Sequence, residues 1–380
     1  MKQYLPLNRY LTEYNEKNNE NKYRPVAVGR YGIRTRESIY SKELANDYSK
    51  NKLIYRNTLT VGMGSVQIDI GILTEDKVYS VSPAYHTYKI REINANYLRY
   101  CLECRNHDMF VRYVKRGTRQ GKSIDLKRWL SYCIPVYDME NQLEIVEKLD
   151  KLSYLIEQRK KQLELLKILV KSHFIEMFGD PCLNTRNFNE VPLKQLYDVS
   201  SSKRIYQEEQ TLEGIPFYKI SDLVDKIRTG SCTPQVYITN STYQDLKEKH
   251  LTPTEGDILI TSRGTLGLCY EIMADDEFYF QDGMISWLYN KREIISNTYL
   301  CYIFQMDGIK RQIDGVTSGS TVRYLSIDKL KNLKVILPPI ELQNEFADFV
   351  TSTNKSKTAI QKSLDDLETL KKSLMQQYFA

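Results

Sequence analysis

Residues 142–178 decide the fold, and they read QLEIVEKLDKLSYLIEQRKKQLELLKILVKSHFIEMF. The stretch contains no Gly and no Pro, and its apolar residues recur at the three- and four-residue spacing of one helix face. A helix of this length extends roughly 55 Å at about 1.5 Å per residue. Its single apolar stripe needs a partner helix. Gly179, Asp180 and Pro181 follow directly and end the helix.

A second stretch near the C-terminus, residues 343–380, follows the same pattern when it is shifted by 201 positions. At that shift Phe346 corresponds to Ile145 and Val350 to Leu149. The sequence therefore predicts two long helices that form an antiparallel coiled coil, with two unrelated amphipathic surface helices as the alternative. The expected seam residues are Ile145, Leu149, Leu152, Ile156, Leu163, Leu166, Val170, Phe346, Val350, Ile360, Leu364, Leu367 and Leu374.

The repeat continues outside the helices. Residues 256–266 (GDILITSRGTL) overlay residues 59–66 at a shift of 200, and Tyr299-Leu300-Cys301-Tyr302 overlays Tyr97-Leu98-Arg99-Tyr100 at a shift of 202. Both halves mix β-rich runs with helical patterns, so we expect an α+β tandem duplication. The polar residues 1–23 are expected to form a lead-in arm. The expected segments are a globular half at 1–141, a helix at 142–178, a globular half at 179–341 and a helix at 342–380.

Composition limits the class of protein. The 380 residues suffice for two or three domains. Lys plus Arg number 54 and Asp plus Glu 48, and the resulting net charge of +6 is compatible with nucleic-acid binding. Seven Cys residues without a regular framework, and no signal peptide, favour reduced thiols in a cytoplasmic protein. No apolar run approaches the roughly 18 residues of a membrane span, so we expect no membrane partner.

Two like halves joined by helices of equal length suggest a reader of two half-sites. Such half-sites must lie on one face of DNA, about 34 Å or a multiple apart, and a rod of roughly 55 Å suits this task. Basic and polar residues in loops of both halves could hold phosphates or base edges, with ordinary solvated charges as the alternative. The candidates are Arg30, Tyr31, Arg34, Arg36, Met63, Ser65, Tyr85, His86, Lys115, Arg116, Arg119, Lys122, Lys203, Arg204, Lys219, Ser221, Arg263, Thr265, Gln281, Ser318, Ser320, Thr321 and Arg323.

Signals for an enzyme are weak. Residues 117–123 (GTRQGKS) fall one residue short of a phosphate-binding loop, because Arg116 stands where the motif needs Gly. Cys101, Cys104 and His107 have metal-like spacing without a second ligand pair, which favours buried helix cysteines over a metal site. The acidic run 275–277 is expected to be a solvated turn. An adenine-methyltransferase tetrapeptide and a Gly-rich cofactor loop are absent, so we expect no cofactor of the chain's own.

These residues resemble a known family, the specificity (S) subunits of type I restriction–modification systems, over essentially the whole chain. The first half carries VGRYGIR at 28–34 and MGS at 63–65, and the second carries IPFYKISDL at 215–223 and GDILITSRG at 256–264. LPPIELQ at 337–343 is similar to the family's entry into its spacer helix. The first half departs from that entry motif, since it has only Pro135 and two extra residues before Gln142.

The resemblance implies two target recognition domains, each reading one half of a split, asymmetric DNA site. It further implies two methyltransferase (M) subunits that bring S-adenosylmethionine and methylate adenine at N6, and two restriction (R) subunits that use ATP and Mg²⁺ for translocation and cleavage. The chain itself is then a non-catalytic reader. Two alternatives stay open: a coiled-coil scaffold that does not read DNA, and an enzyme such as a nuclease or thiol enzyme.

Overall fold

A computed structural model describes residues 2–29, 32–39, 47–116, 121–317 and 323–380, without the side chain of Arg116. The chain divides into two compact units. Unit 1 comprises residues 1–162 and 360–380, and unit 2 comprises residues 163–359. Each unit contains a globular part and one end of each long helix.

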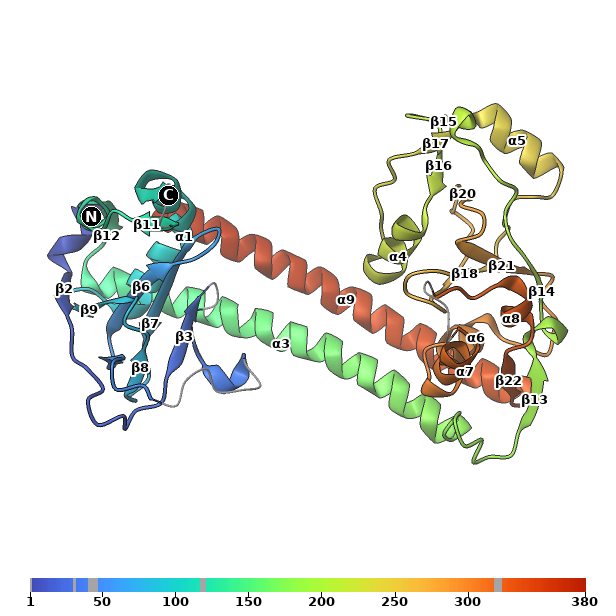
Figure 1. Cartoon of the computed structure of the whole chain (residues 1–380), viewed down its shortest axis with the longest axis horizontal. Helices are drawn as coiled ribbons and strands as arrows, with labels where there is room; N and C mark the ends of the chain where they lie inside the picture. Colours follow the sequence, from blue (N-terminus) through green and yellow to red (C-terminus); the bar gives the residue numbers. More distant parts are fainter. Residues whose placement is uncertain (1, 30–31, 40–46, 117–120, 318–322) are drawn as a thin grey trace. The chain divides into compact units, whose positions relative to one another are not determined.

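The globular part of unit 1 is built on an antiparallel sheet in the order β2-β9-β6-β7 (Figure 1). Val61 of β6 pairs with His86 of β9, and Met63 pairs with Ile68 of β7. The strands are β1 (Gln3–Pro6), β2 (Leu11–Tyr14), β3 (Val26–Gly29), β4 (Gly32–Thr35), β5 (Lys52–Ile54), β6 (Thr58–Met63), β7 (Ile68–Leu73), β8 (Tyr79–Val81), β9 (His86–Ile90), β10 (Val114–Arg116), β11 (Lys122–Ile124) and β12 (Cys133–Val136). The helices are η1 (Leu7–Arg9), η2 (Arg36–Ser38), α1 (Ala95–Tyr113) and α2 (Leu126–Leu130).

The core of unit 1 lies between this sheet, α1, α2 and the long helices. Tyr88 from the sheet and Trp129 from α2 are buried, and their ring centroids are 6.1 Å apart. Leu149 and Phe379 extend the same cluster into the long helices. Burying side chains of this size supplies most of the stabilisation of a globular part.

The globular part of unit 2 repeats the plan, with an antiparallel sheet in the order β14-β21-β18-β19. The short pairs β1-β12 and β13-β22 also correspond to each other. The strands are β13 (Asn189–Pro192), β14 (Asp198–Ser200), β15 (Gln210–Thr211), β16 (Ile215–Tyr218), β17 (Tyr237–Ile238), β18 (Ile258–Thr261), β19 (Cys269–Glu271), β20 (Tyr279–Phe280), β21 (Ile285–Tyr289) and β22 (Lys334–Leu337). The helices are η3 (Leu193–Gln195), η4 (Gln207–Glu209), α4 (Ile220–Thr229), α5 (Asn240–Glu248), α6 (Asn297–Ile303), α7 (Asp307–Thr317) and α8 (Ile327–Lys331).

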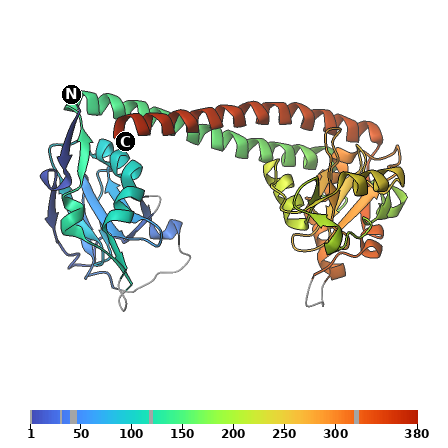
Figure 2. The same cartoon turned by 90° about the horizontal axis from the view of Figure 1, so that it is seen from above.

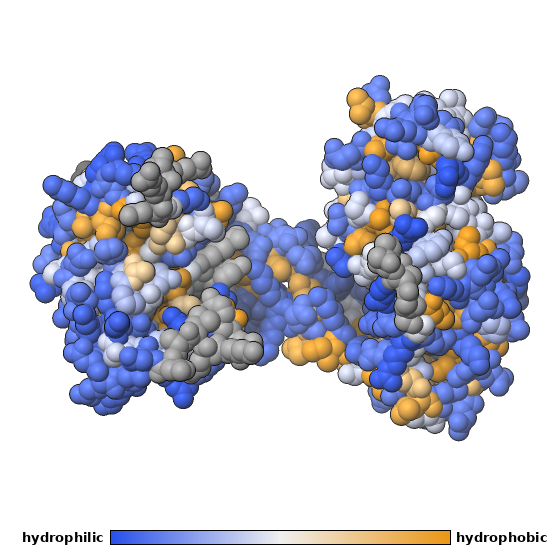
Figure 3. Space-filling view, in the orientation of Figure 1, coloured by the Kyte–Doolittle hydropathy of each residue, from blue (hydrophilic) through white to orange (hydrophobic). Residues whose placement is uncertain are grey.

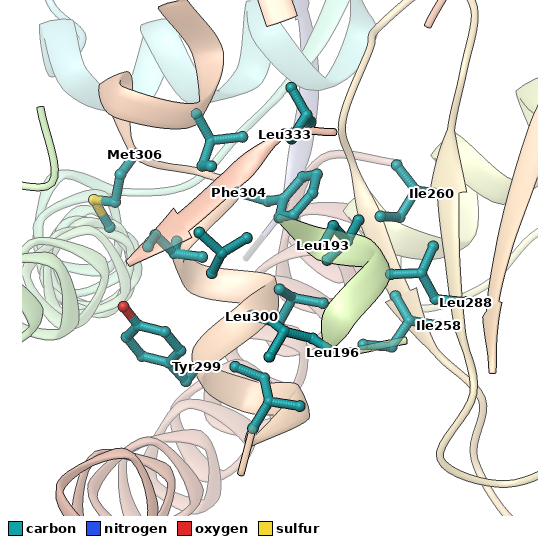
Figure 4. Close-up of a cluster of buried hydrophobic side chains, with 14 of the residues drawn as sticks. Leu193, Leu196, Ile258, Ile260, Leu288, Tyr299, Leu300, Phe304, Met306 and Leu333 are labelled. Atoms are coloured by element: carbon teal, nitrogen blue, oxygen red, sulfur yellow. The ribbon is translucent and has the colours of Figure 1, made fainter. Parts of the chain in front are cut away.

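The main core of unit 2 packs strands β18, β21 and β22 against α6, α7 and α8. Figure 4 shows Leu300 and Phe304 near Leu193, Ile260 and Leu288, and all five side chains are at most 2% exposed. A second sheet, β15-β17-β16-β20, carries α4 and α5. One smaller cluster packs it against α5, and another joins it to Leu259 and Trp287 of the first sheet. Among the described residues of unit 1, the corresponding chain forms the β3-β4 and β5-β8 pairs.

The long helices are α3 (Met139–Phe178) and α9 (Ile340–Phe379). In unit 1, Arg159 donates to Ser363 at 3.2 Å and Lys160 pairs with Glu368 at 2.7 Å. In unit 2, the ring of His173 lies 4.1 Å from that of Phe349, centroid to centroid. Within each unit the segments of α3 and α9 lie side by side (Figures 1 and 2) and run in opposite directions.

The predicted seam residues are all turned away from solvent, at least in part. Eight are buried and the others are half-buried. The buried residues are Ile145, Leu149, Leu152, Leu163, Val170, Phe346, Val350 and Leu364, and the half-buried ones are Ile156, Leu166, Ile360, Leu367 and Leu374. The prediction of paired, antiparallel long helices on an α+β tandem repeat is therefore confirmed.

A buried glutamine joins each long helix to its globular part. Gln142 accepts from the backbone N–H of Asn94 at 2.9 Å and donates to the carbonyl of Tyr137 at 2.7 Å. In unit 2, Gln343 accepts from the N–H of Ser296 at 2.9 Å and donates to the carbonyls of Pro338 and Ile294. Both amides are at most 2% exposed. The repeat therefore extends to the hydrogen bonds that fix the start of each long helix.

Three expectations need correction. Residues 1–23 are not an arm, because β1 and β2 lie there and pair with β12 and β9. Helix α3 begins at Met139, before residue 142, since the Asp138 carboxylate accepts from the N–H of Asn141 at 3.0 Å and caps it. The acidic run 275–277 is solvated only in part: Asp275 and Glu277 are exposed, whereas the Asp276 carboxylate accepts from the hydroxyl of Tyr270 at 2.7 Å and pairs with Lys226 at 3.4 Å.

Candidate nucleic-acid interface

In unit 1, several of the predicted residues meet at one end of the sheet. Because β6 ends where β9 begins, Met63 and Ser65 come close to Tyr85 and His86. Lys122, at the start of β11, donates from its ammonium group to the carbonyl of Ser65. The sheet register thus gathers residues that are far apart in the sequence.

Tyr85 fixes the β3-β4 hairpin at this end of the sheet. Its hydroxyl donates to the carbonyl of Val28 at 2.9 Å, and its own carbonyl accepts from Lys52 at 2.7 Å. Its ring lies on Gly62, where an added Cβ would be 2.3 Å from ring carbons. Glycine is therefore required at this position, and the tyrosine holds the hairpin that carries Arg34.

In unit 2, the corresponding end of the sheet gathers the residues predicted in the second half. Arg263 and Thr265 follow β18, and Gln281 precedes β21. The end of β18 lies beside the start of β21, because Thr261 pairs with Ile285. The N–H of Gln281 donates to the carbonyl of Tyr218 at 3.0 Å. This contact brings the start of α4, with the exposed Lys219 and Ser221, to the same region.

Lys203 and Arg204 reach this region through a loop after β14. The N–H of Lys203 donates to the hydroxyl of Tyr279 at 2.8 Å. Burial raises the pKa of Tyr279 to about 12, so its hydroxyl stays protonated at neutral pH. Arg204 pairs with Asp282 at 2.8 Å.

Among the described residues, four of the predicted basic residues have acidic partners within their own unit. His86 lies 3.0 Å from Glu13, Lys115 pairs with Asp125 at 2.7 Å, and Arg323 pairs with Asp314. Arg204 is the fourth. The hydrogen bond from Lys115 lowers the pKa of Asp125 below its usual range. These cations would have to exchange a carboxylate for a phosphate in order to bind nucleic acid.

Arg263 is held differently. Its guanidinium carbon lies 4.9 Å from the ring centroid of Tyr324, and the backbones of the two residues form a β-bridge. The Nε atom is enclosed and has no hydrogen-bond partner among the described residues. Tyr324 was not predicted, and neither was Arg228, whose Nη2 lies 3.5 Å from Thr265 Oγ1. Tyr324 could have been found from the sequence, because it directly follows the predicted Arg323. No feature of the sequence marked Arg228.

The remaining predicted residues show few contacts that bear on nucleic-acid binding, or they lie outside the described residues. Arg34 is exposed on β4, and Arg36 lies with its guanidinium carbon 5.3 Å from the ring centroid of Tyr48. The candidates that lie outside the described residues, or whose side chain does, are Arg30, Tyr31, Arg116, Arg119, Ser318, Ser320 and Thr321. Most of the surface seen in Figure 3 is hydrophilic, with apolar residues in scattered patches.

The described part of the chain offers neither a metal site nor a membrane-spanning helix. There, no three His, Cys, Asp or Glu side chains come together as a metal site would need. Cys101 is fully buried, and Cys104 lies with its sulfur 3.5 Å from the carbonyl of Met375. None of the helices in the described ranges is both long and apolar enough to cross a membrane.

Comparison with known proteins identifies the family to which the chain belongs. The family model for the type I restriction modification DNA specificity domain matches residues 7–165 and again residues 185–369. A Haemophilus influenzae protein described as a type I restriction enzyme specificity subunit is 30% identical over 230 residues. That match covers 58% of this chain and only 56% of the relative. The specificity subunit of the type I restriction enzyme MjaVIII of Methanocaldococcus jannaschii is 24% identical over 294 residues, 73% of this chain and 68% of its own.

Solved structures share the fold. The S subunit of a type I restriction–modification system from M. genitalium matches with a TM-score of 0.60 at 16% identity, over 100% of this chain and 96% of its own. A chain from a study of complex assembly and conformational transition in a type I restriction–modification system matches with a TM-score of 0.54 at 14% identity, over 99% of this chain and 97% of its own. Two family domains in one chain agree with the duplicated sheets, and the chain belongs to the family of type I restriction–modification DNA specificity proteins.

Proposed function

We propose that this chain is the non-catalytic, DNA-reading subunit of a type I restriction–modification complex. Each globular part reads one half of a bipartite, asymmetric site, and the base pairs between the halves are not read. The observation that carries the proposal is the repeated scaffold: the same end of the same sheet holds basic and polar residues in both units.

The magnitudes support a reader with several contacts in each half. One good bidentate contact to a base contributes about 1–3 kcal/mol of discrimination. Specific binding exceeds non-specific binding by about 4–10 kcal/mol, so a handful of contacts per half is enough. A net charge of +6 over 380 residues contributes little backbone attraction, which argues for partners that add phosphate contacts.

Membership of the family supports two kinds of protein partner. Two M subunits would bring S-adenosylmethionine and methylate adenine at N6 after flipping it out of the duplex. Two R subunits would add ATP- and Mg²⁺-dependent translocation and cleavage. The exposed apolar side chains of Leu165, Ile168 and Leu169 on α3, at 52%, 59% and 48% exposure, support a protein partner on this helix.

Binding experiments at several salt concentrations test the proposal. The purified chain with its M subunit should select a split motif from a random duplex pool, and its affinity should fall steeply with salt because phosphate contacts release counterions. A scaffold that does not read DNA would select no motif at any salt concentration. Inserting two base pairs into the unread gap should abolish selection, and unchanged binding to that duplex would contradict a fixed spacing between the half-sites.

A further inference from the structure

Arg263 occupies a position at which the two globular parts differ. At the shift of 200, Arg263 corresponds to Met63, and Thr265 corresponds to Ser65. Met63 is the last residue of β6, and Arg263 lies just beyond the end of β18. These strand ends correspond, because β6 pairs with β9 as β18 pairs with β21. The same place on the duplicated sheet therefore carries a guanidinium in unit 2 and a thioether in unit 1.

The loop around Arg263 is more open than its counterpart. In unit 1, the N–H of Gly64 donates to the carbonyl of Gln67 at 3.1 Å and closes a tight turn. An added Cβ at Gly64 would lie 2.6 Å from the Asp69 carboxylate. In unit 2, Gly264 has a φ of +65°, and an added Cβ would have no heavy atom of the described residues within 4 Å. Position 264 thus has space around it that position 64 lacks.

The side chain of Arg263 is held against Tyr324. Its stacking on Tyr324 and the β-bridge between the two residues restrict the guanidinium. In the described part of the chain it has no acidic partner, in contrast to Arg204 and Arg323. A restrained guanidinium loses little freedom on binding, and its planar fork matches two acceptors at once.

We propose that Arg263 reads a guanine in the half-site bound by unit 2, by donating to the O6 and N7 atoms in the major groove. Guanine presents these two acceptors side by side, and arginine is the side chain that most often reads them. Met63 offers no donor at the corresponding place, so the two half-sites should differ there. This inference rests on the proposed function and is tested only after the wild-type chain has given a motif.

Methylation sequencing of an Arg263→Met variant with the M subunit is the first test. The preference for guanine at one position of one half-site should fall by roughly 5- to 150-fold, while every other position keeps its preference. An unchanged motif overturns the inference. Uniform weakening at all positions also overturns it, because that result indicates a phosphate contact. Absence of any wild-type motif would count against the proposed function instead.

Arg292→Met is the matched control. Arg292 also lies in unit 2 and also loses a guanidinium, but it pairs with Asp198, which sits opposite Tyr289 at the other end of the sheet. This variant should keep the complete motif. Relaxation of the same guanine position in Arg292→Met would show that the effect is not local and would overturn the inference.

A base analogue removes the dependence on a well-folded variant. 7-Deazaguanine lacks the N7 acceptor, so a duplex with this base at the proposed position should bind the wild-type complex roughly 5- to 150-fold more weakly. An Arg263→Met variant has no donor at this place, and it should bind both duplexes equally. Insensitivity of the wild type at every guanine of that half-site, or equal sensitivity of Arg263→Met, would overturn the inference.

Discussion

The two globular parts share a scaffold and differ in what is attached to it. The four-stranded sheets β2-β9-β6-β7 and β14-β21-β18-β19 have the same strand order, and Gln142 and Gln343 anchor the long helices through equivalent hydrogen bonds. Unit 1 adds the β3-β4 hairpin and the β5-β8 pair, whereas unit 2 adds a second sheet with α4 and α5. The main sheet and the anchors of the long helices are thus repeated, and the elements added to them are not. A repeated scaffold with different added elements is suited to binding two half-sites of different sequence.

The largest expected difference between the units concerns equivalent seam positions. Phe346 is fully buried, and its ring centroid lies 5.3 Å from that of Phe174 and 5.2 Å from that of Tyr302. Phe346→Ala should lower the free energy of unfolding of unit 2 by about 3–5 kcal/mol, and Ile145→Ala should lower that of unit 1 by about 2–5 kcal/mol.

Urea unfolding checks this prediction, because each unit has one tryptophan. Trp129 reports on unit 1 and Trp287 on unit 2, and each can be followed alone when the other is changed to Phe. Loss of less than about 1 kcal/mol in Phe346→Ala would contradict the packing of the seam in unit 2.

The glutamine anchors should differ by a smaller amount. Gln343 makes three hydrogen bonds to backbone groups and Gln142 makes two. Replacement by Leu leaves buried backbone groups unpaired, at a cost of about 1–3 kcal/mol each time. Gln343→Leu should therefore destabilise unit 2 more than Gln142→Leu destabilises unit 1. Thermal unfolding of the two variants shows which one loses more stability. A larger loss in Gln142→Leu would contradict the prediction from the hydrogen bonds.

Replacing either of two equivalent buried tyrosines by Phe should lower the free energy of unfolding of its unit by the same amount. The hydroxyl of Tyr97 donates to the carbonyl of Pro135 at 2.9 Å, and that of Tyr299 donates to the carbonyl of Ile336 at 2.8 Å. Each Tyr→Phe change removes one neutral hydrogen bond, which contributes about 1 kcal/mol. Chemical denaturation should give the same loss in both units within about 0.5 kcal/mol. A clear inequality would show that the repeat does not extend to these contacts.

The smallest expected effect concerns the pKa values of two aspartates and the stability of the fold at acidic pH. The hydrogen bond from Lys115 is the main cause of the lowered pKa of Asp125, whereas the one from Asn290 is the main cause for Asp198. A lowered folded-state pKa stabilises the fold above the unfolded-state pKa, and this contribution is lost as the pH falls through the folded-state value.

Removing one partner should therefore affect the two carboxyls differently. Lys115→Met removes the main cause at Asp125 and should raise its pKa toward the usual range, although the N–H of Arg128 still donates to that carboxylate. Arg292→Met should raise the pKa of Asp198 less, because the bond from Asn290, the main cause there, remains. Carboxyl titration by NMR with labelled aspartate measures both values. Equal shifts in the two variants would contradict the assigned causes.

The sequence was sufficient for the scaffold because its signals are periodic and repeated. The seam positions and the 200- to 203-residue shifts define the long helices and the duplication before any coordinates are known. The hydrogen bonds of Gln142 and the strand status of residues 3–6 could not be predicted, because they depend on partners distant in sequence. Ion pairs such as Arg204–Asp282 were missed for the same reason, and Tyr324 matters only through its contact with Arg263.

Adenine-methylation sequencing is the sharpest test of whether this chain directs methylation to a bipartite site. DNA is compared from cells that carry this chain with its M subunit and from cells that carry the M subunit alone. We expect a split motif, with two unlike groups of specified bases around an unread gap of fixed length, only when the chain is present. A contiguous motif, or no new motif while the M subunit is bound and active, would contradict this expectation.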